Sequence, residues 1–290
     1  MNNELIQSAA PHIHSRRTAA GIRADLLIAL APAAVMSVIT NGSRCILILL
    51  ISIVTAMAAD ILLGITLDKT ATSDSTLSRR ASIIGSLLEA AANGAVFAML
   101  LPYGIPLWLA AAGAAIAVIL FKRIIGLTGR SRLNPAAGAY LIITCILPAV
   151  GISGEEMTMS ICASTAPALA LGFIYLVLRK VIQIRLPLLF VLSFLLAASI
   201  SSSLGVAEVN PFAIMSGSLI LTAVFIAPAY ASSPVTPVGK AVFGICGGVL
   251  AFLLTARLEF EAALAITVII MNILSPFIER FTIPNSRRKN

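Results

Sequence analysis

The chain has 290 residues, of which 59% are hydrophobic and 11% charged, and its formal net charge is +8. Soluble domains carry about 25% charged residues, so this composition excludes a soluble globular protein. The positive charges fall in short segments between long apolar stretches, which indicates contact with anionic lipid headgroups and argues against nucleic-acid binding. The sequence therefore predicts a single polytopic membrane domain over residues 1–290, with the lipid bilayer as its surroundings.

The apolar stretches follow one another as ten candidate spans, which predicts an all-α integral membrane protein with ten transmembrane helices. About 20 apolar residues cross the hydrocarbon core as a helix, and each stretch is near that length. The shorter ones are expected to be tilted, broken or buried among neighbours, and Asn134-Pro135 is well placed to begin the fifth. The candidate spans are 23–41, 45–66, 83–101, 105–121, 135–152, 158–178, 186–204, 211–231, 241–256 and 260–279.

Charge asymmetry predicts the direction of these spans. When the spans alternate across the membrane, eighteen of the twenty Lys and Arg residues fall on one side, and only Arg44 and Arg257 fall on the other. Short cytoplasmic loops retain positive charge during insertion, so the first side is expected to be the cytoplasm. Both termini would then be cytoplasmic, as a segment over 1–22 and a basic tail over 281–290. Residues 1–20 lack the apolar core of a cleavable signal peptide, and the expected location is the cell membrane.

Two acidic residues, Asp60 and Glu89, lie inside apolar spans. Each is seven residues from the polar loop 67–82, which places both about 10 Å into the membrane. No Lys or Arg is expected at that level to neutralise them. Because an intramembrane carboxylate is costly, the two acids could form a cytoplasmic entrance for Na⁺ or H⁺, or share a proton. The alternative is that they face a subunit contact or a shallow water defect. Asp25, beside Arg23, is more simply an interfacial anchor.

The ten spans also allow a 5+5 inverted repeat. Two halves of five spans must have opposite orientations, because five is odd. Residues 93–97 of the third span loosely echo residues 216–219 of the eighth, and each stretch is followed by prolines. Inverted repeats commonly bring broken helices together around a midplane site. The sequence alone leaves the repeat open.

Signatures of soluble enzymes are missing. The four cysteines are scattered without a C-x-x-C pair, so neither a disulfide framework nor a cysteine-ligated cluster is indicated. There is no phosphate loop, dinucleotide fingerprint or nucleophile elbow. The sequence therefore predicts neither a catalytic residue nor a metal site.

Several ordered stretches resemble one family of membrane subunits. Residues 117–140, AVILFKRIIGLTGRSRLNPAAGAY, are similar to its A-x-x-x-x-K-x-x-x-G-G-L-G-x-N-x-F-N-P-A-x-x-G-Y segment. Residues 93–108 resemble its T-G-L-L-L-A-L-x-L-P-P-x-x-P-W-W segment, residues 233–240 its S-P-V-T-x-x-G-K, and residues 271–279 its closing M-N-x-x-x-P-x-I-D helix. Together they resemble RnfD, a membrane subunit of the Rnf ion-translocating oxidoreductase, and its relative NqrB of the sodium-pumping quinone reductase.

This resemblance implies a flavin. The family carries FMN linked through a phosphoester to the threonine of an S-G-A-T-like motif on the outer side. The matching residues 162–167 read CASTAP, so that threonine would be Thr165, with Met159 in place of the usual upstream Asp. Ser216 and Thr222 are carried over as polar contacts to a flavin, and riboflavin is a further cofactor. Phe225 could stack on the flavin ring or simply pack within the protein.

The sequence supports hypotheses from different functional classes. In the first, the chain is a non-autonomous membrane subunit of an Rnf-like translocase, which passes electrons through flavin and couples them to Na⁺ or H⁺ transport. Its partners would be the other subunits, flavin and lipid, because no motif here binds NAD or an iron–sulfur cluster. The second is an inverted-repeat transporter or channel without redox activity. The third is a cofactor-free assembly subunit.

Overall fold

The computed structural model describes residues 18–67, 76–125, 133–151, 159–205, 216–229 and 232–282. The rest of the expected cytoplasmic N-terminal segment and basic tail, residues 1–17 and 283–290, lies outside them. In the described ranges the regular structure is helical apart from one isolated bridge between Pro102 and Ser160.

Ten helical segments match the ten candidate spans in chain order, so the all-α membrane fold is confirmed. They are α1 (Ala19–Asn41), α2 (Arg44–Leu67), α3 (Thr76–Leu100), α4 (Leu107–Ile116) continued by the π-helix η2 (Ala117–Ile124), α5 (Pro135–Ile146) with η4 (Pro148–Val150), η6 (Ala163–Thr165) with α6 (Ala166–Leu178), α7 (Arg185–Ser203), α9 (Gly217–Leu221) continued by the π-helix η7 (Thr222–Ile226), α10 (Pro237–Thr255) and α11 (Phe260–Thr282).

Seven of these segments are long and apolar enough to cross a membrane, and three are shorter. The short ones are 135–150, 163–178 and 217–226, which fits the expectation that some spans are broken. All residues from Gly217 to Ala227 except Ile220 are buried, so the eighth segment lies in the interior of the bundle. Irregular or short helices are tolerated at membrane depth where protein surrounds them, because neighbours can satisfy their backbone groups.

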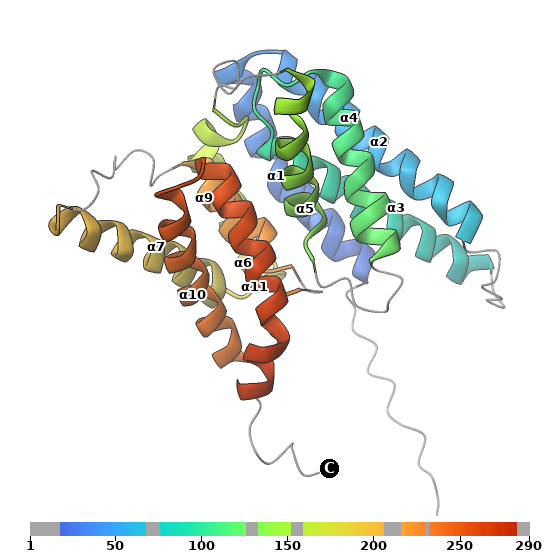
Figure 1. Cartoon of the computed structure of the whole chain (residues 1–290). Coiled ribbons are helices and arrows are strands. Elements are labelled where there is room, and N and C mark those ends of the chain that lie inside the picture. Colours follow the sequence, from blue (N-terminus) through green and yellow to red (C-terminus); the bar gives the residue numbers. More distant parts are fainter. Residues whose placement is uncertain are drawn as a thin grey trace, which may run out of the picture.

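The segments pair in the same way in the two halves of the chain. In the first half α1 contacts α3, α2 contacts α3 and α4, and α4 contacts α5; in the second half α6 contacts α9, α7 contacts α9 and α10, and α10 contacts α11. The halves meet through equivalent members, α1 with α6 and α5 with α11. In Figure 1, α1–α5 form one group, and α7, α10 and α11 lie together beside it. This repeated pairing supports the 5+5 arrangement.

Both ends of the described chain lie on the same side of the bundle. In Figure 1, α1 begins and α11 ends at the lower side, as an even number of crossings requires. We call this side the terminal end, and we call the side where α1 ends and α2 begins the opposite end. That the terminal end faces the cytoplasm remains a prediction from charge.

The contact between α1 and α6 joins the two halves. Asp25 of α1 accepts a hydrogen bond from the Tyr175 hydroxyl at 3.0 Å and pairs with Arg179 at 3.1 Å. It therefore links the halves in addition to lying near a span end. Gly172 of α6 lies so close to α1 that an added Cβ would collide with the Ala29 carbonyl oxygen. Small residues permit such close approach between membrane helices.

Replacing Gly172 with alanine is expected to lower the free energy of unfolding by about 1–3 kcal/mol, because two backbones must separate to admit the methyl group. Thermal unfolding of the purified protein in detergent measures the effect. Gly21→Ala is the matched control, because its new Cβ would meet only Thr18 Oγ1, at 3.4 Å. Equal melting temperatures for the two variants would contradict the close contact of α1 and α6.

Candidate functional site

Five charged side chains meet at the terminal end, and we call them the charge cluster. Asp60 is at its centre, where its Oδ1 atom lies 2.9 Å from Lys122 Nζ and 2.9 Å from Arg123 Nη2. Its Oδ2 atom accepts a hydrogen bond from Ser86 Oγ at 2.6 Å, and its side chain is 2% exposed. The members of the charge cluster are Arg23, Asp60, Glu89, Lys122 and Arg123.

Glu89 forms the more accessible part of the cluster. Its Oε2 atom lies 2.7 Å from Arg23 Nη2 and 3.9 Å from Lys122 Nζ. Arg23 also donates to the Gly85 carbonyl at 2.9 Å, and Lys122 donates to the Ser86 carbonyl at 2.8 Å. Together with the contacts of Asp60 in α2, these bonds tie α1, α2, α3 and η2 to one another.

The expectation that no Lys or Arg lies at the level of Asp60 and Glu89 is wrong. The fourth segment does not end at residue 121: η2 continues to Ile124, so Lys122 and Arg123 lie on a helix beside α2 and α3. Their long side chains reach along apolar surface to buried acceptors. Both acids contact the same Lys122 ammonium, so they do lie at similar depth. Three cationic side chains therefore accompany two carboxylates.

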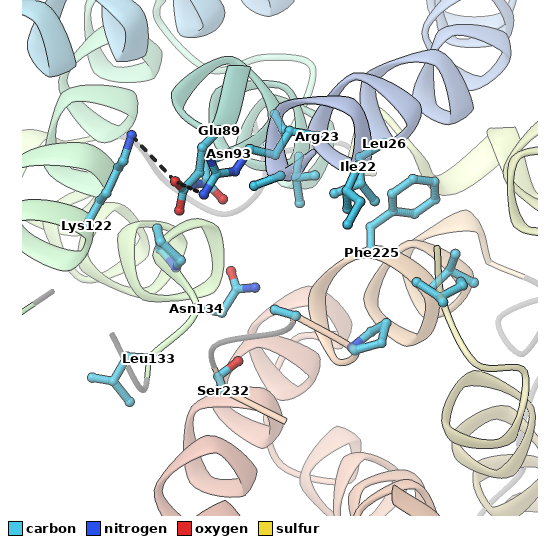
Figure 2. A pocket seen from close by; sticks show the side chains of 18 residues that line it. Ile22, Arg23, Leu26, Glu89, Asn93, Lys122, Leu133, Asn134, Phe225 and Ser232 are labelled. Atoms are coloured by element: carbon cyan, nitrogen blue, oxygen red, sulfur yellow. Dashed lines mark ion pairs between the residues drawn. The ribbon is translucent and has the colours of Figure 1, made fainter. Parts of the chain in front are cut away.

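A cavity of about 320 Å³ opens beside the charge cluster, between the two halves. Figure 2 shows Arg23, Glu89, Asn93 and Lys122 on one side of it and Phe225 with Ile22 and Leu26 on another. The cavity takes its lining from α1, α3, η2, the start of α5, the segment between α6 and α7, η7 and the chain that follows η7. The lining residues are Ala19, Ile22, Arg23, Leu26, Glu89, Ala92, Asn93, Val96, Lys122, Leu133, Asn134, Pro135, Ile182, Val224, Phe225, Pro228, Ala229 and Ser232.

Asn134 fixes one wall of this cavity. Its Oδ1 atom caps α5 by accepting from the amides of Ala136 and Ala137 at 3.0 and 3.3 Å, as the Asn-Pro start predicts. Its Nδ2 atom donates to the Ile226 carbonyl at 3.1 Å, which ties the fifth segment to the eighth. With its amide oriented to satisfy its neighbours, Asn272 accepts from Asn134 N at 3.0 Å and donates to Ser232 Oγ at 3.3 Å. The wall therefore joins residues of both halves.

Thr165 lies at the opposite end, away from this cavity. It is 0% exposed, and its hydroxyl donates to the Cys162 carbonyl at 2.8 Å. Backbone hydrogen bonds from Ile161 and Cys162 tie its segment to the end of α3. An added Cβ at Gly217 would collide with the Cys162 carbonyl oxygen, so α9 packs directly on the same segment. A phosphoester needs the Thr165 oxygen free and room for a phosphate, and this packing does not fit a covalent FMN.

Ser216 and Thr222 do not line the cavity either. Ser216 caps α9, where its Oγ atom accepts from the amide of Ser218 at 3.3 Å, and it lies next to the segment of Thr165. Thr222 lies six residues further along, is 1% exposed, and has a hydroxyl without a hydrogen-bond partner in the described part of the chain. The structure thus brings Ser216 near Thr165, whereas Asp60 and Glu89 meet at the other end of the molecule.

Sequence reasoning missed the residues that define the cavity, above all Lys122, Asn93 and Asn134. Lys122 and Asn134 both stand in the 117–140 stretch that resembles the family pattern, which is the signal that could have found them. Asn93 begins the 93–108 stretch, where the family pattern has Thr, but a single Asn in an apolar span does not reveal which way it faces. The described residues contain no group of three or more His, Cys, Asp or Glu side chains that could hold a metal ion.

Comparison with known proteins identifies the family of the chain. A family model described as the NQR2, RnfD, RnfE family matches residues 6–159 and 150–288. The chain belongs to this family. The described helices and this family membership both identify the chain as a multi-pass membrane protein.

Curated relatives within the NQR2, RnfD, RnfE family match almost from end to end. The D-type subunit of the Na(+)-translocating ferredoxin:NAD(+) oxidoreductase complex of Acetobacterium woodii is 24% identical, with 96% of this chain and 93% of that protein covered. The D-type subunit of the proton-translocating ferredoxin:NAD(+) oxidoreductase complex of Clostridium ljungdahlii is 23% identical, with 96% and 94% covered. The D-type subunit of the ion-translocating oxidoreductase complex of Halorhodospira halophila is 24% identical, with 97% and 94% covered.

Proposed function

We propose that this chain is the D-type membrane subunit of an Rnf-like complex, in which flavin-mediated electron transfer is coupled to transport of Na⁺ or H⁺ across the cell membrane. The match of the family model over nearly the whole chain carries the proposal. The other subunits would supply the soluble electron donor and acceptor sites. The chain itself would contribute a flavin site and part of the membrane passage.

The cavity between the halves is the better place for a flavin. Its volume of about 320 Å³ falls at the lower end of the roughly 300–1,000 Å³ of small-molecule sites. Like such sites, it has a mostly apolar lining with a few polar groups, here Asn93, Asn134, Ser232 and Lys122. Phe225 presents an aromatic ring for stacking. When bound, a flavin would supply the electron-carrying chemistry, which amino-acid side chains do not provide.

The residues of the cavity would bind and orient that group. Asn93, Asn134 and Ser232 offer hydrogen bonds to a polar ring edge, while Ile22, Leu26 and Phe225 exclude water from its faces. The charge cluster has three cationic side chains and two carboxylates, so its net charge is positive by one. That excess favours a ligand that carries or gains negative charge.

The same excess argues against Asp60 as a cation site. A Na⁺ ion at Asp60 would have to displace Lys122 or Arg123 from the atom they share. We therefore assign the charge cluster to holding four helix ends together and to setting the electrostatic field of the cavity. Glu89, which is more accessible, is the member of the pair that could still take part in ion entrance.

The flavin test compares wild-type protein with Thr165→Val after isolation from its natural host, where any flavin transferase is present. We expect flavin to be released by denaturation and the protein band in a denaturing gel to be non-fluorescent for both proteins. A fluorescent wild-type band that disappears in Thr165→Val would show covalent attachment and overturn the assignment to the cavity. Absence of any flavin, with a second ligand in its place, would favour the runner-up, a transporter without redox activity.

The repeated helix pairing is the observation that favours this runner-up. Transporters with inverted repeats place their substrate between the halves, as the cavity is placed here. In such a protein Phe225 and the asparagines would bind the transported molecule. The affinity of the protein for that molecule would then be the same in oxidising and in reducing solution.

A further inference from the structure

A second polar cluster lies at the opposite end of the bundle, far from the charge cluster. Ser160 precedes η6, Ser218 is in the first turn of α9, and Glu261 is in the first turn of α11. Ser160 Oγ lies 2.7 Å from Glu261 Oε1, Ser218 Oγ lies 3.0 Å from the same atom, and the two hydroxyl oxygens are 2.8 Å apart. Three oxygen atoms from three segments therefore form a closed triangle, which we call the oxygen triangle.

The oxygen triangle has too few hydrogen atoms for its contacts. Each serine hydroxyl supplies one hydrogen, and an ionised carboxylate supplies none. With Glu261 ionised, two hydrogens cannot lie along three oxygen–oxygen contacts, so one contact leaves two lone pairs facing each other. The Cys162 thiol, 3.5 Å from Ser218 Oγ and 3.7 Å from Ser160 Oγ, cannot place a hydrogen between oxygens. A cation bound by all three oxygens would remove this repulsion.

In the part of the chain that the structure describes, the carboxylate of the oxygen triangle also has no cationic partner. Among the described residues, Asp25, Asp60 and Glu89 each form an ion pair, whereas Glu261 forms none. Its position in the first turn of α11 stabilises its negative charge through the helix macrodipole. Ser160 and Ser218 are 4% and 0% exposed, so the negative charge faces buried hydroxyls.

A further polar group, the Thr222 hydroxyl, lies deeper in the molecule than the oxygen triangle. Thr222 is four residues after Ser218, on the same face of the segment and one turn deeper. Its buried hydroxyl has no hydrogen-bond partner among the described residues, although buried polar groups are almost always hydrogen-bonded. It lies where α9 gives way to the π-helix η7, a distortion that is frequent at functional sites.

We propose that Ser160, Ser218 and Glu261 bind a Na⁺ ion, with Thr222 as the next oxygen along its path. Hard cations prefer oxygen ligands, and discontinuous helices commonly provide them in transporters. This inference rests on the proposed function and adds to it a binding site for the transported ion, at the end of the molecule opposite the charge cluster. If the terminal end is cytoplasmic, the Na⁺ site faces outwards.

Equilibrium binding of radioactive Na⁺ to the purified full chain in lipid nanodiscs tests this site without any electron donor, so it does not depend on the flavin. We expect saturable binding by wild-type protein, weakened at least about tenfold in Glu261→Gln and in Ser218→Ala. Glu259→Gln, which removes an exposed acid two residues earlier, is the matched control and should bind as wild type does. Absence of saturable binding by wild type, or equal affinity of Glu261→Gln and Glu259→Gln, overturns the proposal.

Thr222→Val provides a test that does not depend on whether those variants fold. It removes an unpartnered hydroxyl at constant shape, so the variant should be at least as stable as wild type while its Na⁺ affinity falls about threefold. The rise in melting temperature on replacing choline chloride by NaCl at equal ionic strength measures the same binding. That rise should shrink in Thr222→Val, and an unchanged rise would exclude Thr222 from the path.

Discussion

Asp60→Asn is expected to lower the free energy of unfolding by about 3–5 kcal/mol, because it leaves the partly buried Lys122 and Arg123 side by side without their shared, buried anion. Lys122 is only 10% exposed, so water cannot screen the resulting repulsion. A loss of this size corresponds to a drop in melting temperature of roughly 5–8 °C for a chain of 290 residues. Thermal unfolding of the purified chain, at fixed detergent and salt, is the measurement.

Two further variants separate electrostatics from packing. Asp60→Asn combined with Arg123→Gln should recover part of the lost stability, because it removes one of the two cations left facing each other. Asp25→Asn is the comparison: Asp25 is buried, but its partner Arg179 is 56% exposed and can be hydrated when it loses the carboxylate, so the expected loss is smaller, about 1 kcal/mol. If Asp60→Asn is as stable as wild type, the charge cluster does not hold the helix ends, and the cation-entrance hypothesis for Asp60 regains its basis.

Ala229→Trp is expected to abolish the ligand site with little effect on the fold. Ala229 lines the cavity but is only half-buried, so an indole at this position can extend into the empty space. Much of the cavity would then be filled, and we expect flavin content to fall at least about tenfold. Flavin released by denaturation, measured by fluorescence per mole of protein, checks this result.

The matched control for bulk is Ala256→Trp. Ala256 is exposed at the C-terminal end of α10, at the opposite end of the bundle, and does not line the cavity. This variant should retain wild-type flavin content. Equal flavin in Ala229→Trp and Ala256→Trp would show that flavin binds elsewhere.

The number and order of the helices were predictable because each span must be long and apolar in lipid. Hydropathy also anticipated that some segments would be broken, and the short segment Gly217–Ile226 is the clearest case. Charge gave a direction, and the structure shows both described ends on one side, which fits an even number of crossings. These features depend on local composition, which a single sequence contains.

The partners of the buried acids were not predictable in the same way. Counting residues from a loop placed Asp60 and Glu89 at one depth, and both do contact Lys122. It could not show that η2 extends the fourth segment beyond residue 121, nor that Lys and Arg side chains would reach inwards from it. Which helices are neighbours is a tertiary property, so the pairing of Asp60 with Arg123 had no local signal.

At the opposite end of the bundle, too, the sequence alone did not reveal which residues lie together. Thr165 was named from its motif, yet its accessibility depends on how closely α9 packs over Cys162. Glu261 stood in the sequence as one of several acids near span ends, and nothing local linked it to two serines more than forty residues away. Only the fold brings Ser160, Ser218 and Glu261 together.

The most direct test of the proposed function uses the whole complex in sealed vesicles from a host that lacks this chain. Restoring the wild-type chain should restore both electron transfer to the terminal acceptor and the accompanying uptake of Na⁺ or H⁺. Ala229→Trp should assemble, as shown by co-purification of the other subunits, but should restore neither, whereas Ala256→Trp should restore both. Full electron transfer and ion uptake with an assembled, flavin-free Ala229→Trp chain would contradict the account.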